Sequence, residues 1–448
     1  MRFDTVIRHG TVVTASDTFV SDVGIKDGRI AALAAELTDA DEIIDATGLF
    51  VLPGGIDSHV HLDQPSGDGI VMADDFDSGT RSAAIGGNST VLAFCMQEKG
   101  QSLREALKVY HAKAEGKCHV DVSFHLVITD PTAEVLGQEL PALVEDGYTS
   151  LKVFMTYEGL RLRDDEILAT LDTARRTGAL VMVHCENEDA IRYLIGRHEE
   201  DGKFEPKFHA TTRPIAAERE AMEEIRRARQ RGQKIAGETC PQYLMLTADD
   251  LDQSEMEGAK YVCSPPPRDK ASQDACWEGL EQGVFDLFSS DHCPFRFDDP
   301  EGKLNEKGKR HFRWIPNGIP GVATRLPILF SEGVMKGRID INQFVALTST
   351  NHAKLYGLYP RKGTIAVGAD ADIALWDPNK SVTIRNDMLH HGADYTPYEG
   401  LDIRGWPVRL LLRGKTIVED GHFAQQIGQG GYLRRDLSSL TRQRGGQI

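Results

Sequence analysis

The sequence predicts an α/β protein, in which a parallel (β/α) barrel is flanked by a β-sandwich that both chain ends build together. In the central part, short apolar runs alternate with amphipathic helical stretches, the pattern of repeated β-α units around a parallel sheet. Both ends carry short β-rich runs with tight turns instead, and 448 residues suit one large barrel with an accessory domain. We expect a sandwich from 1–54 plus 365–424, a barrel over 55–364 and a C-terminal tail over 425–448.

The sandwich is predicted from its turns. The N-terminal runs TVIRHGTVVT and VGIKDGRIAAL and the later runs DADIALWDP, SVTI and RLLLRGKTIVEDG are short and rich in β-branched residues. Two-residue turns that contain glycine favour β-hairpins. The expected turns are His9-Gly10, Asp27-Gly28, Arg413-Gly414 and Asp420-Gly421.

The barrel is predicted from alternating strands and helices. The expected strands are STVLAF, DVSFHLVI, SLKVFM, LVMVHC, KIAGETC and DLFSSD, and the expected helices are SLREALKVYHAKAEG, DDEILATLDTARRTG and EREAMEEIRRARQRG, each ending near a glycine. The charged stretch 295–314 is expected to be a mobile loop, a candidate lid. The tail, rich in Gly, Arg and Ser, is expected to be either disordered or a strap onto a neighbouring subunit.

Composition excludes several classes of protein. A net charge of -17 argues against a nucleic-acid binder, and no apolar run approaches the roughly 18 residues of a membrane span. The seven cysteines are scattered without a C-x-x-C pair, so we expect free thiols in a reducing cytoplasm. The N-terminus lacks the pattern of a secretory signal. We expect a small-molecule partner.

The strongest local signal is the pair His59 and His61, which follows an apolar run ending in Pro-Gly-Gly. At a spacing of two, both imidazoles leave the same face of a strand, so both can reach one metal ion. The alternative is two surface histidines on a loop. The neighbouring Asp57 and the preceding strand favour the metal site.

Three further polar residues lie within or at the end of apolar runs. Lys152 lies inside TSLKVFMTY, His184 closes LVMVHC and Asp291 closes DLFSSD. A buried ammonium needs compensation, so Lys152 forms either a structural ion pair or a carbamate that bridges two metals, which requires the neutral amine. Because active sites of parallel barrels lie at the C-terminal strand ends, these side chains are expected to converge with the histidine pair.

A series of motifs gives the chain a family resemblance. HVH, LKVFMTY, HCEN, GETCPQYL, CSPPPR, SSDHCPF and IPNGIPGV occur in the order and approximate spacing of the cyclic amidohydrolases, most closely the dihydropyrimidinase/hydantoinase branch. The resemblance covers nearly the whole chain. It implies a TIM-type barrel with a flanking β-sandwich, a homotetramer and a binuclear centre, most simply of zinc. It also implies hydrolytic opening of dihydropyrimidines or 5-substituted hydantoins to N-carbamoyl amino acids.

The resemblance also implies roles for residues of this chain. His59, His61 and Asp291 would hold one metal, His184 would help hold the other, and Lys152 as its carbamate would bridge both. Tyr157 would donate to the developing oxyanion, while Ser264 and Asn317 would hold the imide edge of the substrate through backbone groups. Asp291 would accept a proton and return it to the leaving nitrogen.

The chain departs from the family pattern between His184 and Glu238. Family members have a further strand there, ending in a V-H-x-S-like motif whose histidine completes the second metal site. This chain is shorter by roughly one β-α unit, on the order of twenty residues, and His209 is a possible substitute ligand. A record that lacks residues, a real deletion variant and a non-catalytic relative all explain the deficit. Since a seven-stranded barrel would expose an edge, a missing or altered segment is favoured.

Two kinds of alternative function stay open. A non-catalytic scaffold related to the collapsin response mediator proteins would explain the missing histidine, although such relatives typically lose several ligands. Allantoinase and dihydroorotase are alternatives within the enzyme class. The segment LDQPSG after His61 carries no arginine that would clamp a dihydroorotate carboxylate, and IPNG fits the hydantoinase branch better than allantoinases.

Overall fold

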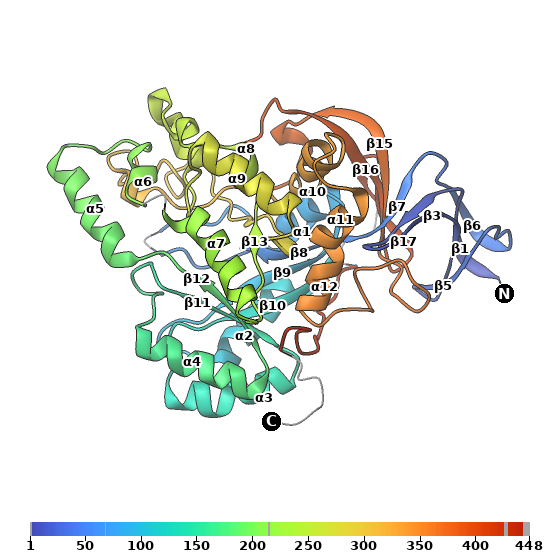
Figure 1. Ribbon diagram of the computed structural model, residues 1–448, viewed down its shortest axis with the longest axis horizontal. Helices are drawn as coiled ribbons and strands as arrows, with labels where there is room; N and C mark the ends of the chain where they lie inside the picture. Colours follow the sequence, from blue (N-terminus) through green and yellow to red (C-terminus); the bar gives the residue numbers. More distant parts are fainter. Residues whose placement is uncertain (1, 68, 214–215, 425–428, 442–448) are drawn as a thin grey trace.

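A computed structural model describes residues 2–67, 69–213, 216–424 and 429–441. Its centre is a curled parallel sheet surrounded by helices, and its β-rich end holds strands from both the beginning and the end of the chain (Figure 1). The α/β class and the sheet domain predicted from the sequence are therefore present.

The parallel sheet carries the residues of interest at its carboxyl end. Five strands pair in the order β12-β11-β10-β9-β8 and two more pair as β13-β14. A parallel bridge between Val60 and His292 joins the two groups. The bounds are β8 Gly55–Val60, β9 Asn88–Met96, β10 Asp121–Val127, β11 Ser150–Phe154, β12 Leu180–His184, β13 Glu238–Thr239 and β14 Leu287–Phe288.

The parallel sheet has a seam between β12 and β13. Among the described residues, the segment between these strands forms helices and no strand, and no ladder joins the two. Val183 of β12 is consequently 37% exposed, whereas the side chains of β10 are buried throughout. The sequence KIAGETC forms a strand only at its last part, Glu238–Thr239, so the longer strand predicted there is wrong.

Helices cover the outside of the parallel sheet (Figure 1). The predicted helices appear as α2, α4 and α7. The α-helices are α1 Phe76–Ile85, α2 Leu103–Ala114, α3 Leu140–Glu145, α4 Asp164–Thr177, α5 Glu188–Glu200, α6 Phe208–Thr211, α7 Ala216–Gln230, α8 Pro241–Met245, α9 Lys270–Glu281, α10 Arg325–Leu329, α11 Ile341–Val345 and α12 Asn351–Leu355. In the described ranges, no helix has both the length and the apolar character needed to cross a bilayer.

Short helical turns extend or connect these elements. The π-helical turns are η1 Val135–Glu139, η5 Phe330–Val334 and η6 Ala346–Thr350, and the 3-10 turns are η2 Ala248–Leu251, η3 Ser254–Tyr261, η4 Phe312–Trp314 and η7 Asn386–Met388.

The β-rich end consists of two sheets with the orders β5-β4-β1-β6 and β18-β17-β16-β15-β7-β2-β3. Antiparallel pairing of β7 with β15 joins the two chain ends, and one apolar cluster contains residues of both, including Ile25 and Leu411. The strands are β1 Phe3–Arg8, β2 Thr11–Val13, β3 Thr18–Val20, β4 Asp22–Lys26, β5 Arg29–Ala34, β6 Ala40–Asp45, β7 Phe50–Pro53, β15 Ile373–Thr383, β16 Asp402–Leu412, β17 Lys415–Glu419 and β18 His422–Phe423.

Three of the four predicted hairpins are confirmed. Asp27-Gly28, Arg413-Gly414 and Asp420-Gly421 each connect paired antiparallel strands, and all six residues have positive φ, as type I′ turns require. The hairpin at His9-Gly10 is wrong. There β1 pairs with β4 and β6 while β2 pairs with β3 and β7, so the chain crosses from one sheet to the other.

The stretch 295–314 is anchored rather than free. Lys303 is fully buried and Asn305 is 7% exposed. The Lys303 ammonium donates to the carbonyls of Val262, at 2.7 Å, and Pro316, at 3.0 Å. Opening would break both hydrogen bonds and leave the two buried carbonyls without a donor, so the prediction of a mobile lid is wrong for this part of the stretch.

The C-terminal tail packs against its own chain where the structure describes it. Leu433 is 2% exposed, and its backbone bonds to Val122 of β10. Arg435 is 4% exposed, and its guanidinium donates to the hydroxyls of Ser123 and Ser150, both at 2.8 Å. Disorder is therefore wrong for residues 429–441, while a strap onto a neighbouring subunit stays a prediction. The rest of the predicted tail, 425–428 and 442–448, lies outside the described residues.

Arg435→Ala is expected to lower the free energy of unfolding by about 2–4 kcal/mol, because it empties a buried volume and leaves the Ser123 and Ser150 hydroxyls and a carbonyl without their donor. Thermal unfolding of the purified variant measures this loss. Arg434→Ala is the matched control, since this neighbour has a side chain 67% exposed and pairs with Asp146 at the surface. Equal melting temperatures for the two variants would contradict the role of Arg435.

Candidate metal centre

Two imidazoles and a carboxylate converge at the carboxyl end of the parallel sheet. The ligand atoms offered by His59, His61 and Asp291 all lie within 4.8 Å of one another. The Asp291 Oδ1 atom is 3.2 Å from His59 Nε2 and 3.4 Å from His61 Nε2. This is the group that the sequence predicts for one metal ion, and its side chains are only 11–19% exposed.

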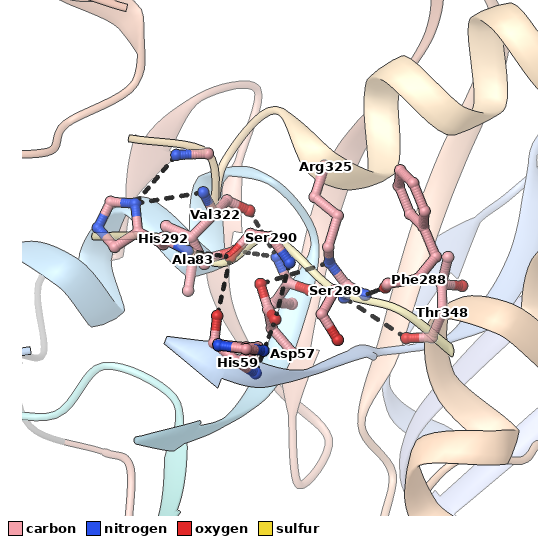
Figure 2. A network of polar contacts seen from close by, with 12 residues as sticks. Asp57, His59, Ala83, Phe288, Ser289, Ser290, His292, Val322, Arg325 and Thr348 are labelled. Carbon is pink, nitrogen blue, oxygen red and sulfur yellow. Dashed lines mark hydrogen bonds and ion pairs between the residues drawn. The ribbon is translucent and has the colours of Figure 1, made fainter. Parts of the chain in front are cut away.

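Buried polar contacts fix the backbone under this cluster (Figure 2). Asp57 accepts hydrogen bonds from the backbone amides of His59 and Ser290, both at 3.2 Å. Its other carboxylate oxygen is 3.5 Å from Arg325 Nε, and both side chains are fully buried. Because one carboxylate binds the strand that carries the histidines and the segment that carries Asp291, it aligns the two.

The second ring nitrogens of the histidines are held by other side chains. His59 Nδ1 lies 2.7 Å from Glu238 Oε2, and His61 Nδ1 lies 2.7 Å from Gln64 Oε1. The Ser289 hydroxyl donates to the other oxygen of Glu238 at 2.5 Å. Donation from Nδ1 to an oxygen leaves Nε2 as the lone-pair nitrogen and fixes the ring orientation, as around most metal-bound histidines.

Glu238 is a functional residue that the sequence reasoning missed. It lies 179 positions from His59 along the chain, and the motif GETC marked it only as part of a family pattern. The sequence marks Glu238 in the same way as Asp291 and His184, because each is a polar residue near the end of an apolar run.

The electrostatics of the cluster favour a charged Asp291. Burial raises the pKa of its carboxyl, but the charge of His59 and the hydrogen bond with His61 outweigh burial and lower the pKa to about 2. Burial lowers the pKa of His61, and this outweighs the attraction of Asp291. For Glu238, burial raises the pKa, but the charge of His59 and the hydrogen bonds it accepts leave the pKa below its usual range.

Lys152 is a buried amine without an ion pair. Its side chain is 4% exposed, and its Nζ lies over the rings of Phe94 and Phe154 at 5.3 and 5.2 Å. In the described part of the chain, no carboxylate comes within ion-pair distance of this Nζ, so the structural ion pair considered above is absent. Burial lowers the pKa of Lys152 against the attraction of Glu238 and Asp291, which favours the neutral amine that carbamate formation needs.

His184 lies apart from the histidine pair and has its own partner. Its Nε2 is 2.7 Å from Glu186 Oε2, and its ring stacks on Phe154 with centroids 5.7 Å apart. The structure thus does not bring His184 into the cluster of His59, His61 and Asp291.

His209, the possible substitute ligand, is bound elsewhere. Its Nε2 donates to the carbonyl of Cys263 at 2.8 Å, and its Nδ1 accepts from Arg213 at 3.1 Å. Both ring nitrogens are therefore engaged. Through the carbonyl of Cys263, His209 supports the segment that carries Ser264.

The three remaining predicted residues lie near one another through shared partners. Burial raises the pKa of the Tyr157 phenol, so it keeps its proton, and a hydrogen bond links its side chain to Ser264. Lys303 donates to Val262 and Pro316, which precede Ser264 and Asn317. The Gly318 amide also donates to Val262 at 3.0 Å. One buried ammonium thus joins the two segments expected to hold the substrate.

Lys303 gives the protein a pH dependence of stability that can be isolated. Burial lowers its pKa to about 7, whereas an unfolded lysine has a pKa of about 10.4. Between these values the unfolded chain binds a proton that the folded chain does not, so this group makes stability rise with pH, by up to about 1.4 kcal/mol per pH unit.

Lys303→Met is expected to lose this dependence. The difference in melting temperature between the parent and this variant should shift in favour of the parent as the pH rises from 7 to 9. Lys309→Met, in the same stretch and at the surface with a side chain 49% exposed, is the control. Parallel melting curves across this pH range for the parent and Lys303→Met would refute the assignment.

The chemistry of this donor set fits a divalent ion. Two imidazole nitrogens and one charged carboxylate suit zinc and similar ions, and Glu238 and Gln64 supply the supporting contacts. The unpaired Lys152 is a second feature that metal chemistry would explain. With a phenol donor and a backbone clamp nearby, the arrangement can polarise a carbonyl, accept a proton from water and hold a planar amide edge.

Comparisons with known proteins agree with this geometry. Residues 50–417 match the model of the amidohydrolase family. The chain is 45% identical to a D-hydantoinase of Geobacillus stearothermophilus, covering 96% of each chain, and 43% identical to a D-hydantoinase of Rhizobium radiobacter, covering 96% of this chain and 99% of that one. The crystal structure of a dihydropyrimidinase from Brevibacillus agri superposes with a TM-score of 0.93 at 44% identity, covering 97% of this chain and 99% of that chain.

The comparison also bears on length. The alignment with the Geobacillus stearothermophilus protein extends over 458 residues, more than the 448 of this chain, so that protein contains residues without a counterpart here.

Proposed function

Since the chain belongs to the amidohydrolase family, we propose that the converging Nε2 atoms of His59 and His61 with Asp291 form the metal site of a cyclic amidohydrolase. The enzyme hydrolyses the cyclic amide bond of hydantoins and dihydropyrimidines, and the products are N-carbamoyl amino acids. The convergence of these three side chains is the observation that carries the proposal. It also favours an enzyme over a scaffold.

The residues that would hold the metal differ between its two sites. His59, His61 and Asp291 would hold the first ion, for which zinc is the simplest choice. Lys152, after its neutral amine adds to carbon dioxide and loses a proton, would offer a carbamate as a ligand to both ions, and His184 would help hold the second. When bound, divalent ions lower the pKa of water and polarise the carbonyl of the scissile amide.

The chain supplies the proton transfers and the orientation. Asp291, charged at neutral pH, accepts the proton of the attacking water and returns it to the leaving nitrogen. Tyr157, which keeps its proton, donates a hydrogen bond from its hydroxyl to the oxygen on which negative charge develops. Backbone groups at Ser264 and Asn317 bind the imide edge, and Lys303 keeps these two segments at a fixed separation.

We propose that the second metal site is weaker than the first, because the chain lacks one β-α unit between His184 and Glu238. The seam between β12 and β13 supports this position, and the alignment that is longer than the chain supports the absence of a segment, without giving its place. His184, at the end of the strand beside the seam, bonds to Glu186 instead of joining the cluster.

The organisation of the enzyme is part of the same proposal. The domains are a β-sandwich from 1–54 with 365–424, a hydrolase barrel over 55–364 and the segment 425–448. The assembly is a homotetramer. The enzyme works in the cytoplasm, in keeping with the seven free cysteines. Light scattering of the purified protein measures its mass.

Metal analysis combined with ring opening tests the function. The purified protein is stripped with a chelator, reloaded with zinc or manganese, and assayed with dihydrouracil and with hydantoin. We expect metal-dependent turnover and at least one tightly bound ion per chain, with the second bound more weakly. Absence of turnover with every cyclic amide and metal would refute the enzyme, and tight binding of two equivalent ions would refute the weak second site.

A further inference from the structure

Asp291 adopts a backbone conformation that its surroundings must maintain. Its φ is 49°, which lies in the left-handed region that residues with a side chain rarely occupy. Such a conformation persists only where the neighbouring structure determines it. Asp57 fixes the N-terminal side, because its carboxylate accepts a hydrogen bond from the amide of Ser290 at 3.2 Å. The C-terminal side depends on His292, the residue that directly follows Asp291.

The backbone of His292 connects Asp291 to the strand of the histidine pair. The carbonyl of His292 accepts a hydrogen bond from the amide of His61 at 2.7 Å. The amide of His292 donates to the Ser290 hydroxyl at 3.0 Å. Because these bonds lie next to Asp291 in the chain, a shift of His292 would move the Asp291 carboxylate relative to His61.

The side chain of His292 is fully buried, and both of its ring nitrogens are bonded. Nδ1 accepts hydrogen bonds from the amides of Gly321, at 3.0 Å, and Val322, at 3.4 Å (Figure 2). Because Nδ1 uses its lone pair for these donors, the ring proton lies on Nε2, which donates to Asp74 Oδ2 at 2.9 Å. The ring is therefore held from two sides.

Asp74 connects the His292 ring to the segment that follows the histidine pair. The Asp74 side chain is fully buried, and its other oxygen, Oδ1, accepts a hydrogen bond from the Gly392 amide at 2.7 Å. The Asp74 carbonyl accepts one from the amide of Asp63, which comes just after His61, at 2.9 Å. The carboxylate therefore has a donor at each oxygen, and its backbone is bonded to the chain beyond the first metal ligands.

We propose that Asp74 and His292 are positioning residues, which hold Asp291 where its carboxylate meets His59 and His61. The proposal rests on the proposed function, in which Asp291 is a metal ligand and a proton acceptor. A carboxylate acceptor makes a hydrogen bond stronger than one between neutral groups. Loss of a partner that orients a metal ligand typically weakens metal binding or activity about 10- to 100-fold. Removal of the Asp74–His292 pair should therefore impair both.

His292→Leu removes both hydrogen bonds of the ring and keeps most of its volume. With the metal-loaded, full-length protein and hydantoin as substrate, we expect kcat to fall about 10- to 100-fold. KM should stay nearly unchanged, because the backbone groups at Ser264 and Asn317 that bind the imide edge are untouched. His292→Gln is the conservative variant, since its Nε2 can donate to Asp74 like that of histidine, and it should lose clearly less of kcat.

Asp74→Asn tests the carboxylate itself. One terminal atom of asparagine is a donor, so it faces either the Nε2 proton of His292 or the amide of Gly392, and one of these two bonds is lost. We expect kcat to fall about tenfold, again with a nearly unchanged KM.

Binding of cobalt(II) reports the placement of the metal ligands without catalysis. The metal-free protein is titrated with Co²⁺, and the visible absorption of the bound ion gives its affinity and coordination. We expect His292→Leu and Asp74→Asn to weaken binding of the first equivalent about tenfold and to change its spectrum.

His119 supplies the matched control. It is also buried, with 6% of its side chain exposed, and its Nε2 lies 2.7 Å from Asp77 Oδ1. In the described part of the chain, no hydrogen bond or ion pair joins this pair to the metal cluster. His119→Leu should therefore lower the melting temperature, as His292→Leu does, and leave kcat and cobalt binding unchanged.

The outcomes separate this inference from the proposed function. Folded His292→Leu and Asp74→Asn proteins with the kcat and cobalt affinity of the parent would refute the positioning role. Equal losses in His119→Leu would refute it as well, because they would follow from lower stability alone. If His292→Leu does not fold, His292→Gln and Asp74→Asn decide by the same two measurements. A parent that opens no cyclic amide refutes the proposed function, while the cobalt affinities still decide whether the pair positions Asp291 as a ligand.

Discussion

Asp291→Asn is expected to lower kcat/KM for hydantoin opening by about 10³-fold or more, the largest effect of any single change discussed for this chain. One carboxylate oxygen contacts both His59 Nε2 and His61 Nε2. An amide can neither accept the proton of the attacking water nor supply a negative ligand, and loss of acid-base catalysis alone costs 10²- to 10⁴-fold. Steady-state kinetics with saturating metal measure the loss.

The metal content and melting temperature of Asp291→Asn identify its cause. We expect weaker metal binding and a nearly unchanged fold, since Asp57 and Arg325 still align the strands beneath the site. Asp172→Asn, a surface change on α4 with a side chain 54% exposed, serves as the control. An Asp291→Asn enzyme within tenfold of the parent would remove this residue from the chemistry.

Lys152→Gln is expected to reduce kcat/KM by about 10²- to 10³-fold while leaving the metal-free protein at least as stable as the parent. The loss follows if the carbamate is needed to place both ions, because metal catalysis is worth several kcal/mol. The stability should not fall, because Lys152 is buried without an ion pair and its charge therefore does not stabilise the folded state.

Lys362 provides the contrast. It is also buried, but it pairs with Asp121 at 2.6 Å and with Asp372. Lys362→Gln should therefore lower the melting temperature clearly, because it leaves the buried carboxylate of Asp372 without its cation and Asp121 with Arg413 alone. If Lys152→Gln lowers the melting temperature of the metal-free protein by as much, Lys152 is structural and not a carbamate.

A chemical rescue separates the carbamate from other roles of Lys152. In Lys152→Ala the cleared volume accepts a short carboxylic acid, and added acetate or propionate should restore part of the activity in a concentration-dependent way. Lys152→Arg keeps a cation that forms no carbamate, and it should be neither active nor rescued. An active Lys152→Arg enzyme would contradict the carbamate.

Local pattern was enough to predict the strands that position the site. Runs such as STVLAF and DVSFHLVI are rich in apolar residues, and every position of β9 and β10 is buried, as expected of a sheet that is covered on both faces. Residues that close such runs, Asp291 and His184 among them, could be identified for the same reason.

Contacts between distant segments could not be predicted in this way. His9-Gly10 has the residues of a hairpin turn, but whether the next strand stays in the same sheet depends on partners such as β4 and β7. The many charged residues of 295–314 predicted a mobile loop, but Lys303 within it is buried and donates hydrogen bonds to the carbonyls of Val262 and Pro316. The bond between Glu238 and His59 likewise depends on the fold.

The seam between β12 and β13 separates the proposed metal ligands into two groups that are carried by different parts of the sheet. His59, His61 and Asp291 project from β8 and the segment after β14, which the bridge of Val60 to His292 joins directly, so their spacing is independent of the seam. His184 ends the strand that borders the gap. Any widening of the gap therefore displaces His184 first, and the proposed first ion would keep its ligands while the bridging geometry is lost.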